Sequence, residues 1–135
     1  MPVLHHVAVT VTSLVEARPW YDAVLGVLGY RPEIVSERIC TWTGATPEIL
    51  VYPDEGDDRS PHTHGRPGWQ HAAFAVDDRT MVDAVHRAVI EVGSGTVVHA
   101  PREYDYMPGY YAVFVTDPSG VRWEILHAPS ISANT

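Results

Sequence analysis

Two histidines and one glutamate have the residue types and the spacing of a metal-binding set. His6 and His71 lie in short apolar, β-branched runs that predict strands, and Glu124 lies in the middle of another such run. A carboxylate in an apolar strand is costly to bury unless a cation or a metal accompanies it. Two histidines and a carboxylate can bind a divalent metal on one side and leave its other coordination positions open.

Alternation along the predicted strands decides which side chains share a face with these residues. His6 lies on the face of Ala8, and His71 lies on the face of Trp69 and Ala73. Small or polar neighbours on these faces leave room for a site. A simpler interpretation stays open, in which both histidines are hydrogen-bonded core residues and the glutamate pairs with an arginine.

The elements that must position these residues form a repeat. Moving the sequence against itself by 65 positions, the separation of His6 and His71, superimposes similar residues: Ala8 on Ala73, Val11 on Val76, Ala23 on Ala88, Val24 on Val89 and Val27 on Val92. We therefore predict a single α+β domain over residues 1–135, made of two paired βαβββ modules. The first module covers residues 1–53, an acidic Pro/Gly linker residues 54–67, the second module residues 68–128 and a C-terminal tail residues 129–135.

Turn and capping signals predict the limits of the elements. Ser13 and the Asp77/Asp78 pair are expected to cap two helices, which end at Gly29 and Gly93. We expect Pro19 in the first turn of its helix, so that the regular helix begins near Glu16. Strands are predicted over residues 5–12, 31–37, 39–43, 48–52, 69–76, 96–99, 110–116 and 121–127.

Charge and composition exclude several classes of function. The formal charge is −8, with nine basic residues, all of them arginine, against seventeen acidic ones. An acidic chain repels phosphate backbones and anionic lipids, so we expect neither nucleic acid nor a membrane as a partner. Chemistry that depends on lysine is excluded, and the single Cys40 excludes an intramolecular disulfide and a thiolate zinc cluster. No signal for secretion is visible, so a cytoplasmic location is expected.

Four segments together resemble the vicinal oxygen chelate superfamily, which contains glyoxalases, bleomycin resistance proteins and extradiol dioxygenases. They are residues 6–11, residues 20–26, residues 68–76 and residues 110–124. The last contains an Asp-Pro-Ser-Gly turn followed four residues later by Glu124, the most specific part of the resemblance.

The resemblance implies an open, curved mixed β-sheet cup around a divalent metal ion, which could be zinc, nickel, manganese or iron(II). Carried over by position, His6, His71 and Glu124 are three of the metal ligands. It also implies a homodimer, although pairing of the two modules within one chain stays open.

The fourth ligand of glyoxalase-type members has no clear counterpart. Such members place a donor in the middle of the last strand of the first module, here residues 48–52, where only Glu48 at its start is a donor. With Glu48 turned inward the site has four ligands and a candidate general base. With three ligands it resembles the dioxygenase or fosfomycin-modifying branches more closely.

Tyrosines and an arginine complete the set of candidate site residues. Either Tyr110 or Tyr111 should face the cup, where a hydroxyl could donate a proton or hold an oxyanion. Tyr104 and Tyr106 lie in a Pro- and Gly-flanked loop that could close over the mouth. Arg122 shares the face of Glu124 and could offset an anionic substrate group, and Trp69 could line the cavity.

The function expected from the resemblance is metal-dependent and glyoxalase-like, a lyase or isomerase acting on a small oxygenated substrate. A ring-cleaving extradiol-type dioxygenase is the first alternative. A metal-free protein that binds a drug or metabolite, like the bleomycin resistance proteins, is the second.

Overall fold

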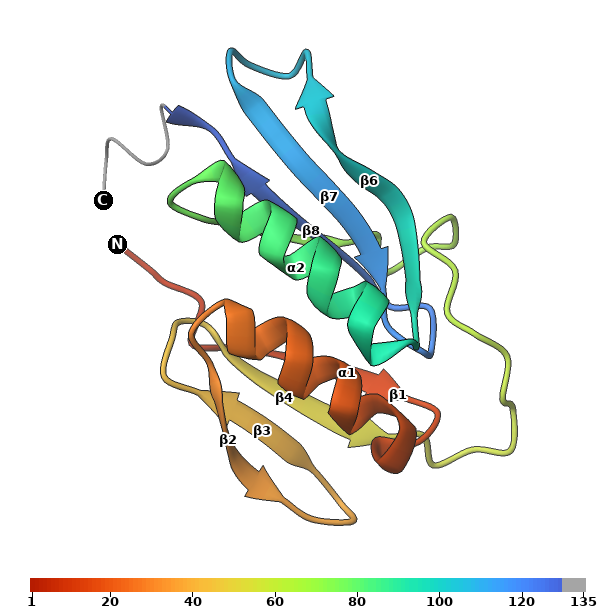
Figure 1. Ribbon diagram of the computed structural model, residues 1–135. Coiled ribbons are helices and arrows are strands. Elements are labelled where there is room, and N and C mark those ends of the chain that lie inside the picture. The colour runs from red at the N-terminus through yellow and green to blue at the C-terminus, as the bar shows by residue number, and fades with distance from the viewer. Residues whose placement is uncertain (130–135) are drawn as a thin grey trace.

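The computed structural model describes residues 1–129 and divides them into two βαβββ units. Figure 1 shows the two units side by side, each with its helix in front of its strands. The first contains β1 (His6–Val11), α1 (Leu14–Val27), β2 (Arg31–Val35), β3 (Cys40–Thr43) and β4 (Glu48–Pro53). The second contains β5 (Ala72–Ala75), α2 (Arg79–Val92), β6 (Thr96–Tyr104), β7 (Tyr110–Thr116) and β8 (Arg122–His127).

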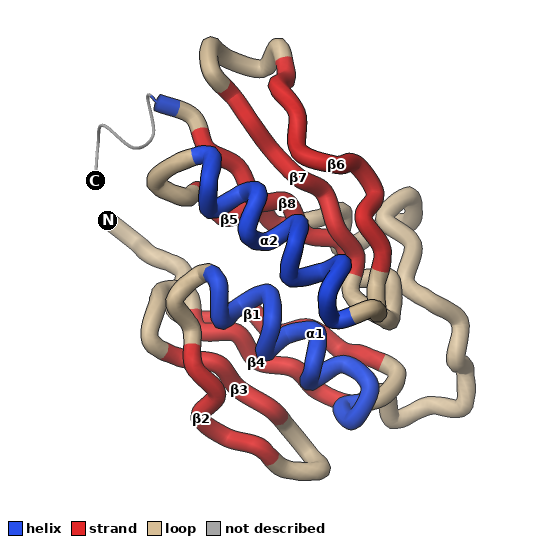
Figure 2. The backbone as a smooth tube through the Cα atoms, in the orientation of Figure 1, coloured by secondary structure: helices blue, strands red, loops and turns tan. Residues whose placement is uncertain are grey.

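The two units have the same sheet topology, which confirms the predicted α+β fold with two βαβββ modules. One sheet has the strand order β1-β4-β3-β2 and the other the order β5-β8-β7-β6 (Figure 2). In each sheet the first and last strands of the module pair in parallel, and the remaining pairs are antiparallel. Both sheets are therefore mixed.

One hydrophobic core joins the modules within the chain. Helix α1 contacts α2 as well as its own sheet, and the fully buried Trp20, Trp42 and Trp123 belong to a single cluster. The Tyr21 hydroxyl donates to Asp117 of the second module at 2.7 Å and accepts from Trp123 Nε1 at 3.3 Å. These hydrogen bonds satisfy polar groups inside the shared core.

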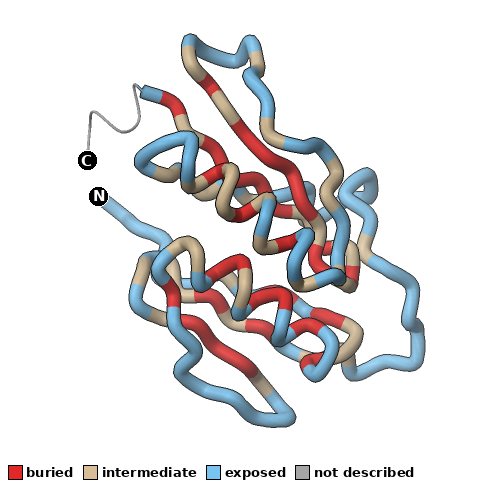
Figure 3. The backbone as a smooth tube through the Cα atoms, in the orientation of Figure 1, coloured by how far each residue is buried: buried red, intermediate tan, exposed pale blue. Residues whose placement is uncertain are grey.

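Each sheet packs one face under its helix; the other face is exposed along β1, whereas β7 and β8 have buried residues on both faces (Figure 3). On β1, His6, Ala8 and Thr10 are exposed, whereas the alternate residues Val9 and Val11 are buried. On the second sheet a smaller apolar cluster covers part of the open face, formed by Tyr110, Ala112, Phe114, Leu126 and Ala128. Candidate site residues on these open faces are thus separated from the main core.

The predicted helix ends at Ser13, Asp78 and Gly93 are confirmed. Ser13 Oγ accepts from the Glu16 amide at 3.3 Å, and Asp78 Oδ1 accepts from the Met81 amide at 3.0 Å. Gly93 ends α2 with φ of 75°, a left-handed conformation that glycine adopts at little cost. Helix α2 is therefore capped by its glycine, and α1 ends at Val27, two residues before Gly29.

Three predicted limits are wrong. Helix α1 begins at Leu14, so Pro19 lies inside it. Pro19 has no N–H to donate to the carbonyl of Val15. Val15 is highly exposed, so water can hydrogen-bond this carbonyl instead. Strand β5 begins at Ala72 instead of Trp69. Strand β6 continues to Tyr104 past Pro101, which an edge strand tolerates beside the register irregularity between His99 and Arg102.

The segment between β4 and β5 has no helix or strand but is attached to the second module. The His62 amide donates to the Ser119 carbonyl at 2.8 Å, and His62 Nε2 lies 2.8 Å from the Trp69 carbonyl oxygen. Residues 54–71 therefore run across the surface along a defined path. Within residues 1–129, no helix has the length and apolar character needed to cross a membrane.

Candidate functional site

A histidine and a buried glutamate meet on the open face of the second sheet. His71 Nε2 lies 3.0 Å from Glu124 Oε1. Glu124 is only 3% exposed, and the His71 side chain is 31% exposed. In the sheet, Glu124 is flanked by Ala73 on β5 and Phe114 on β7. The small side chain of Ala73 leaves room for the imidazole to reach the carboxylate.

Two further side chains hold this pair in place. The Tyr110 hydroxyl donates to Glu124 Oε2, and His71 Nδ1 is hydrogen-bonded to Gln70 Oε1. Burial and the neighbouring carboxylate raise the pKa of Tyr110 far above its usual value, so its proton stays on the phenol. Because an amide oxygen accepts, His71 Nδ1 donates to Gln70 Oε1, and this contact orients the ring with Nε2 toward Glu124 Oε1.

The pair lines a cavity of about 310 Å³ built entirely from the second module. Its other walls come from the segment before β5, from β6 and the loop after it, and from β7 and β8. They are Gln70, His99, Arg102, Tyr104, Tyr106, Phe114 and Arg122. The sequence-predicted residues Tyr104, Tyr106 and Arg122 therefore lie beside His71 and Glu124.

The geometry of the His71–Glu124 pair fits two adjacent ligands of one divalent metal. Metal–nitrogen and metal–oxygen bonds are about 2.1 Å, so two ligands at right angles stand about 3.0 Å apart. The measured distance between Nε2 and Oε1 is 3.0 Å. Within residues 1–129, however, no three His, Cys, Asp or Glu side chains lie close enough together to hold a metal ion.

The third predicted ligand, His6, lies on the first module. His6 pairs in register with Glu48, so both side chains lie on the open face of that sheet. His6 Nδ1 is 2.9 Å from His5 Nδ1, and Glu48 Oε1 accepts from Thr43 Oγ1 at 3.1 Å. Register also shows that Leu50, the partner of Ala8, stands where Glu124 stands in the second module.

Besides His6 and Glu48 on the first module, two more of the sequence-predicted side chains lie away from the His71–Glu124 pair. Tyr111 is on the opposite face of β7 from Tyr110, and its hydroxyl donates to Asp83 of α2 at 2.7 Å. The Trp69 ring packs on Trp123 with centroids 5.3 Å apart, and its Nε1 donates to the Arg122 carbonyl at 3.0 Å. Trp69 lies three residues before β5, whereas His71 directly precedes it, so strand alternation does not extend to the Trp69 ring.

Gln70, His99, Arg102 and Phe114 line the cavity but were missed from the sequence. Strict alternation along β6 would put His99 and Arg102 on opposite faces, because they are three residues apart. The register shift between them brings both to the same cavity. Pro101 was the one sequence signal of this irregularity.

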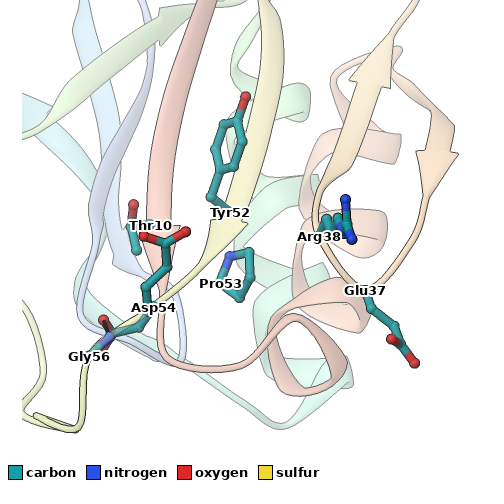
Figure 4. Close-up of a pocket in the computed structure, with 8 residues that line it drawn as sticks. Thr10, Glu37, Arg38, Tyr52, Pro53, Asp54 and Gly56 are labelled. Carbon is teal, nitrogen blue, oxygen red and sulfur yellow. Dashed lines mark hydrogen bonds between the residues drawn. The ribbon is translucent and has the colours of Figure 1, made fainter.

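A second, larger cavity of about 810 Å³ lies on the first module at the ends of β1 and β4. Figure 4 shows Thr10 and Tyr52 from these strands, with Glu37 and Arg38 on the turn between β2 and β3. None of the sequence-predicted site residues lines it, whereas five of them line the smaller cavity.

Comparisons with known proteins agree with the fold and with the expected resemblance. The family model of the Glyoxalase/Bleomycin resistance protein/Dioxygenase superfamily matches residues 3–125. The uncharacterised protein YqjT of Bacillus subtilis strain 168 is 24% identical over 128 residues, 94% of this chain and 99% of that protein.

Solved structures extend the comparison. A glyoxalase/bleomycin resistance protein from Albidiferax ferrireducens T118 is 27% identical with a TM-score of 0.75, over 92% of this chain and 97% of that chain. A lactoylglutathione lyase from Agrobacterium tumefaciens, 20% identical over 95% of each chain with a TM-score of 0.66, shares the fold. On the match to residues 3–125, this chain belongs to the Glyoxalase/Bleomycin resistance protein/Dioxygenase superfamily.

Proposed function

We propose that this protein is a metal-dependent, glyoxalase-like enzyme, a lyase or isomerase acting on a small oxygenated substrate. The observation that carries the proposal is the His71–Glu124 pair, whose donor atoms are 3.0 Å apart in a cavity of this superfamily's fold. A divalent metal held there would polarise a substrate carbonyl and stabilise the enolate-like charge that forms beside it.

Each side chain of the pair has a supporting residue with a defined task. Tyr110 keeps Glu124 Oε2 hydrogen-bonded, which directs Oε1 toward the metal position. Gln70 does the same for the His71 ring through Nδ1. Glu48 is the candidate general base: a carboxylate oxygen would take the proton from the carbon beside the carbonyl and return it to the neighbouring carbon.

A second copy of this chain completes the site in our proposal. The first module carries His6 on an exposed sheet face, and the second module carries His71 and Glu124 in its cavity. A two-fold symmetric dimer that sets the first module of one copy against the second module of the other would unite the three ligands twice. The absence of a three-residue cluster within residues 1–129 supports this arrangement.

Metal content tests the first part of the proposal. Purified protein is equilibrated with Fe(II), Mn(II), Ni(II) or Zn(II), and bound metal is counted per chain. We expect one metal per chain in the wild type and in His86→Ala, a control histidine on α2, and almost none in His71→Ala. Unchanged metal binding in His71→Ala would contradict the site; drug binding without metal would favour a sequestering protein.

Deuterium exchange separates the reaction classes. With 2-hydroxyketones or 2-oxoaldehyde adducts in D₂O, we expect exchange at the carbon beside the carbonyl, followed by NMR. Glu48→Gln should retain the metal and lose the exchange. Oxygen consumption with a catechol, and no exchange, would instead establish the dioxygenase alternative.

Hybrid dimers test whether two copies share the site. His6→Ala and His71→Ala chains with different tags are co-expressed, and the dimer containing one of each is purified. A shared site leaves one complete ligand set per hybrid dimer, so we expect half the wild-type metal. A site formed within one chain leaves both sets incomplete and restores nothing.

A further inference from the structure

The cavity around His71 and Glu124 has a positive lining in an acidic protein. Two guanidinium groups, those of Arg102 and Arg122, line it together with the single carboxylate of Glu124. The whole chain carries a formal charge of −8. The local excess of positive charge favours binding of an anion in this cavity, whereas the net negative charge of the chain disfavours anions elsewhere.

Neither guanidinium is neutralised by a carboxylate. The ion pairs in the described part of the chain involve Arg18, His71 and Arg79, and none involves Arg102 or Arg122. Both cavity arginines instead lie over aromatic rings. Cζ of Arg102 is 4.5 Å from the centroid of the Tyr104 ring, and Cζ of Arg122 is 5.1 Å from that of the Phe114 ring. Ring contacts fix the planes of the two groups and leave their N–H edges for an acceptor.

Arg122 has an unused donor. Its Nη1 lies 3.1 Å from His64 Nε2, and its Nε is buried without a hydrogen-bond partner. A buried donor without a hydrogen-bond partner costs stability. A ligand oxygen accepting from Nε would remove this cost, which makes Arg122 the natural anchor for an anionic group.

We infer that the substrate is a small carboxylate, with its carboxylate group held by Arg122 and Arg102. This inference rests on the proposed function and narrows its substrate to one chemical class. A planar carboxylate matches the paired donors of a guanidinium. His71 and Glu124 line the same cavity as the two arginines, so an oxygen on the adjacent carbon would have them as its neighbours. A 2-hydroxy or 2-oxo acid, or a derivative that keeps this arrangement, has both features.

Calorimetry with simple probes tests the inference on the full-length protein. Lactate and pyruvate are titrated into metal-free and metal-loaded wild type, with uncharged lactamide and inorganic phosphate as comparisons. We expect the carboxylates to bind at least about tenfold more tightly than lactamide, because the charge-assisted hydrogen bonds are lost with the charge. Equal binding of lactamide, or tighter binding of phosphate, would overturn the assignment to a carboxylate.

Matched arginine variants locate the binding. Arg122→Gln and Arg102→Gln should each weaken lactate binding by about tenfold or more, and Arg18→Gln on α1 should leave it unchanged. Arg102 lies on the exposed edge strand β6, so its replacement should fold even where Arg122→Gln does not. Unchanged lactate binding in folded Arg102→Gln would refute its role.

Metal content is measured in the same samples and keeps the two proposals apart. Both arginine variants should retain wild-type metal, because neither guanidinium is a ligand. Metal binding without carboxylate binding would refute the present inference and leave the proposed function standing. Carboxylate binding in a protein that takes up no metal would support the present inference and contradict the metal dependence of the proposed function.

Discussion

Replacing Tyr110 by phenylalanine removes one hydrogen bond and nothing else from the candidate site. Tyr110 is 9% exposed and Glu124 3% exposed, so water does not readily replace the lost donor. A hydrogen bond to a charged group contributes about 1.5–3 kcal/mol, and we expect a decrease of this size in the free energy of unfolding. Because Glu124 Oε2 is then unrestrained, metal affinity should fall by about 10- to 100-fold.

The neighbouring residue supplies a matched control. Tyr111 donates to Asp83 on the other face of the same strand, where both groups are partly open to water. Tyr111→Phe should therefore cost at most about 1 kcal/mol and leave metal affinity unchanged. Urea unfolding of metal-free protein gives the first quantity, and competition with a chelator gives the second. Equal metal affinity in the two variants would refute the role of Tyr110 in holding Glu124 for the metal.

Three further substitutions test other parts of the structure. Leu50→Glu places a carboxylate at the first-module position that corresponds to Glu124. Metal affinity, measured by competition with a chelator, should rise by about tenfold or more. Tyr52→Glu, on the same face, is the control and should not increase the affinity. Burial and Asp117 raise the pKa of Tyr21, so its contribution to stability is complete below about pH 10 and is lost as the pH rises further. In urea unfolding above this pH, Tyr21→Phe should lose less free energy of unfolding than the wild type. Gly120 has φ of 87°, and a Cβ there would clash with the His62 carbonyl oxygen, so Gly120→Ala should lower the free energy of unfolding by about 1–3 kcal/mol.

The sequence predicts the second half of the site well because β7 and β8 are regular. Their antiparallel pairing runs without a shift from Tyr111 to Thr116, so alternation holds. It correctly separates Tyr110 from Tyr111 and places Arg122 on the face of Glu124. Capping residues and the repeat likewise reveal both modules, since those signals are local.

Alternation fails where the backbone departs from a regular strand. The shifts in β6 bring His99 and Arg102 to one cavity, although their spacing assigns them to opposite faces. Trp69 has the parity of His71 but lies three residues before β5, and it packs on Trp123 of the main core. Both errors have one physical cause: side-chain direction follows the hydrogen-bonded ladder, and the sequence marks the limits of that ladder only weakly.

The register of the two modules also decides what Glu48 can do. Glu48 pairs with His6, whereas Glu124 pairs with Ala73, two residues beyond His71. Two residues along a strand span about 6.6 Å, which is three times a metal–ligand bond of about 2.1 Å. Glu48 is displaced by this length from the position equivalent to Glu124. Glu48 therefore does not occupy the position that the repeat assigns to a fourth ligand, because Leu50 occupies it. In the function we propose, Glu48 lies on the same face and outside the ligand set, so it would act as the base beside a site of three ligands.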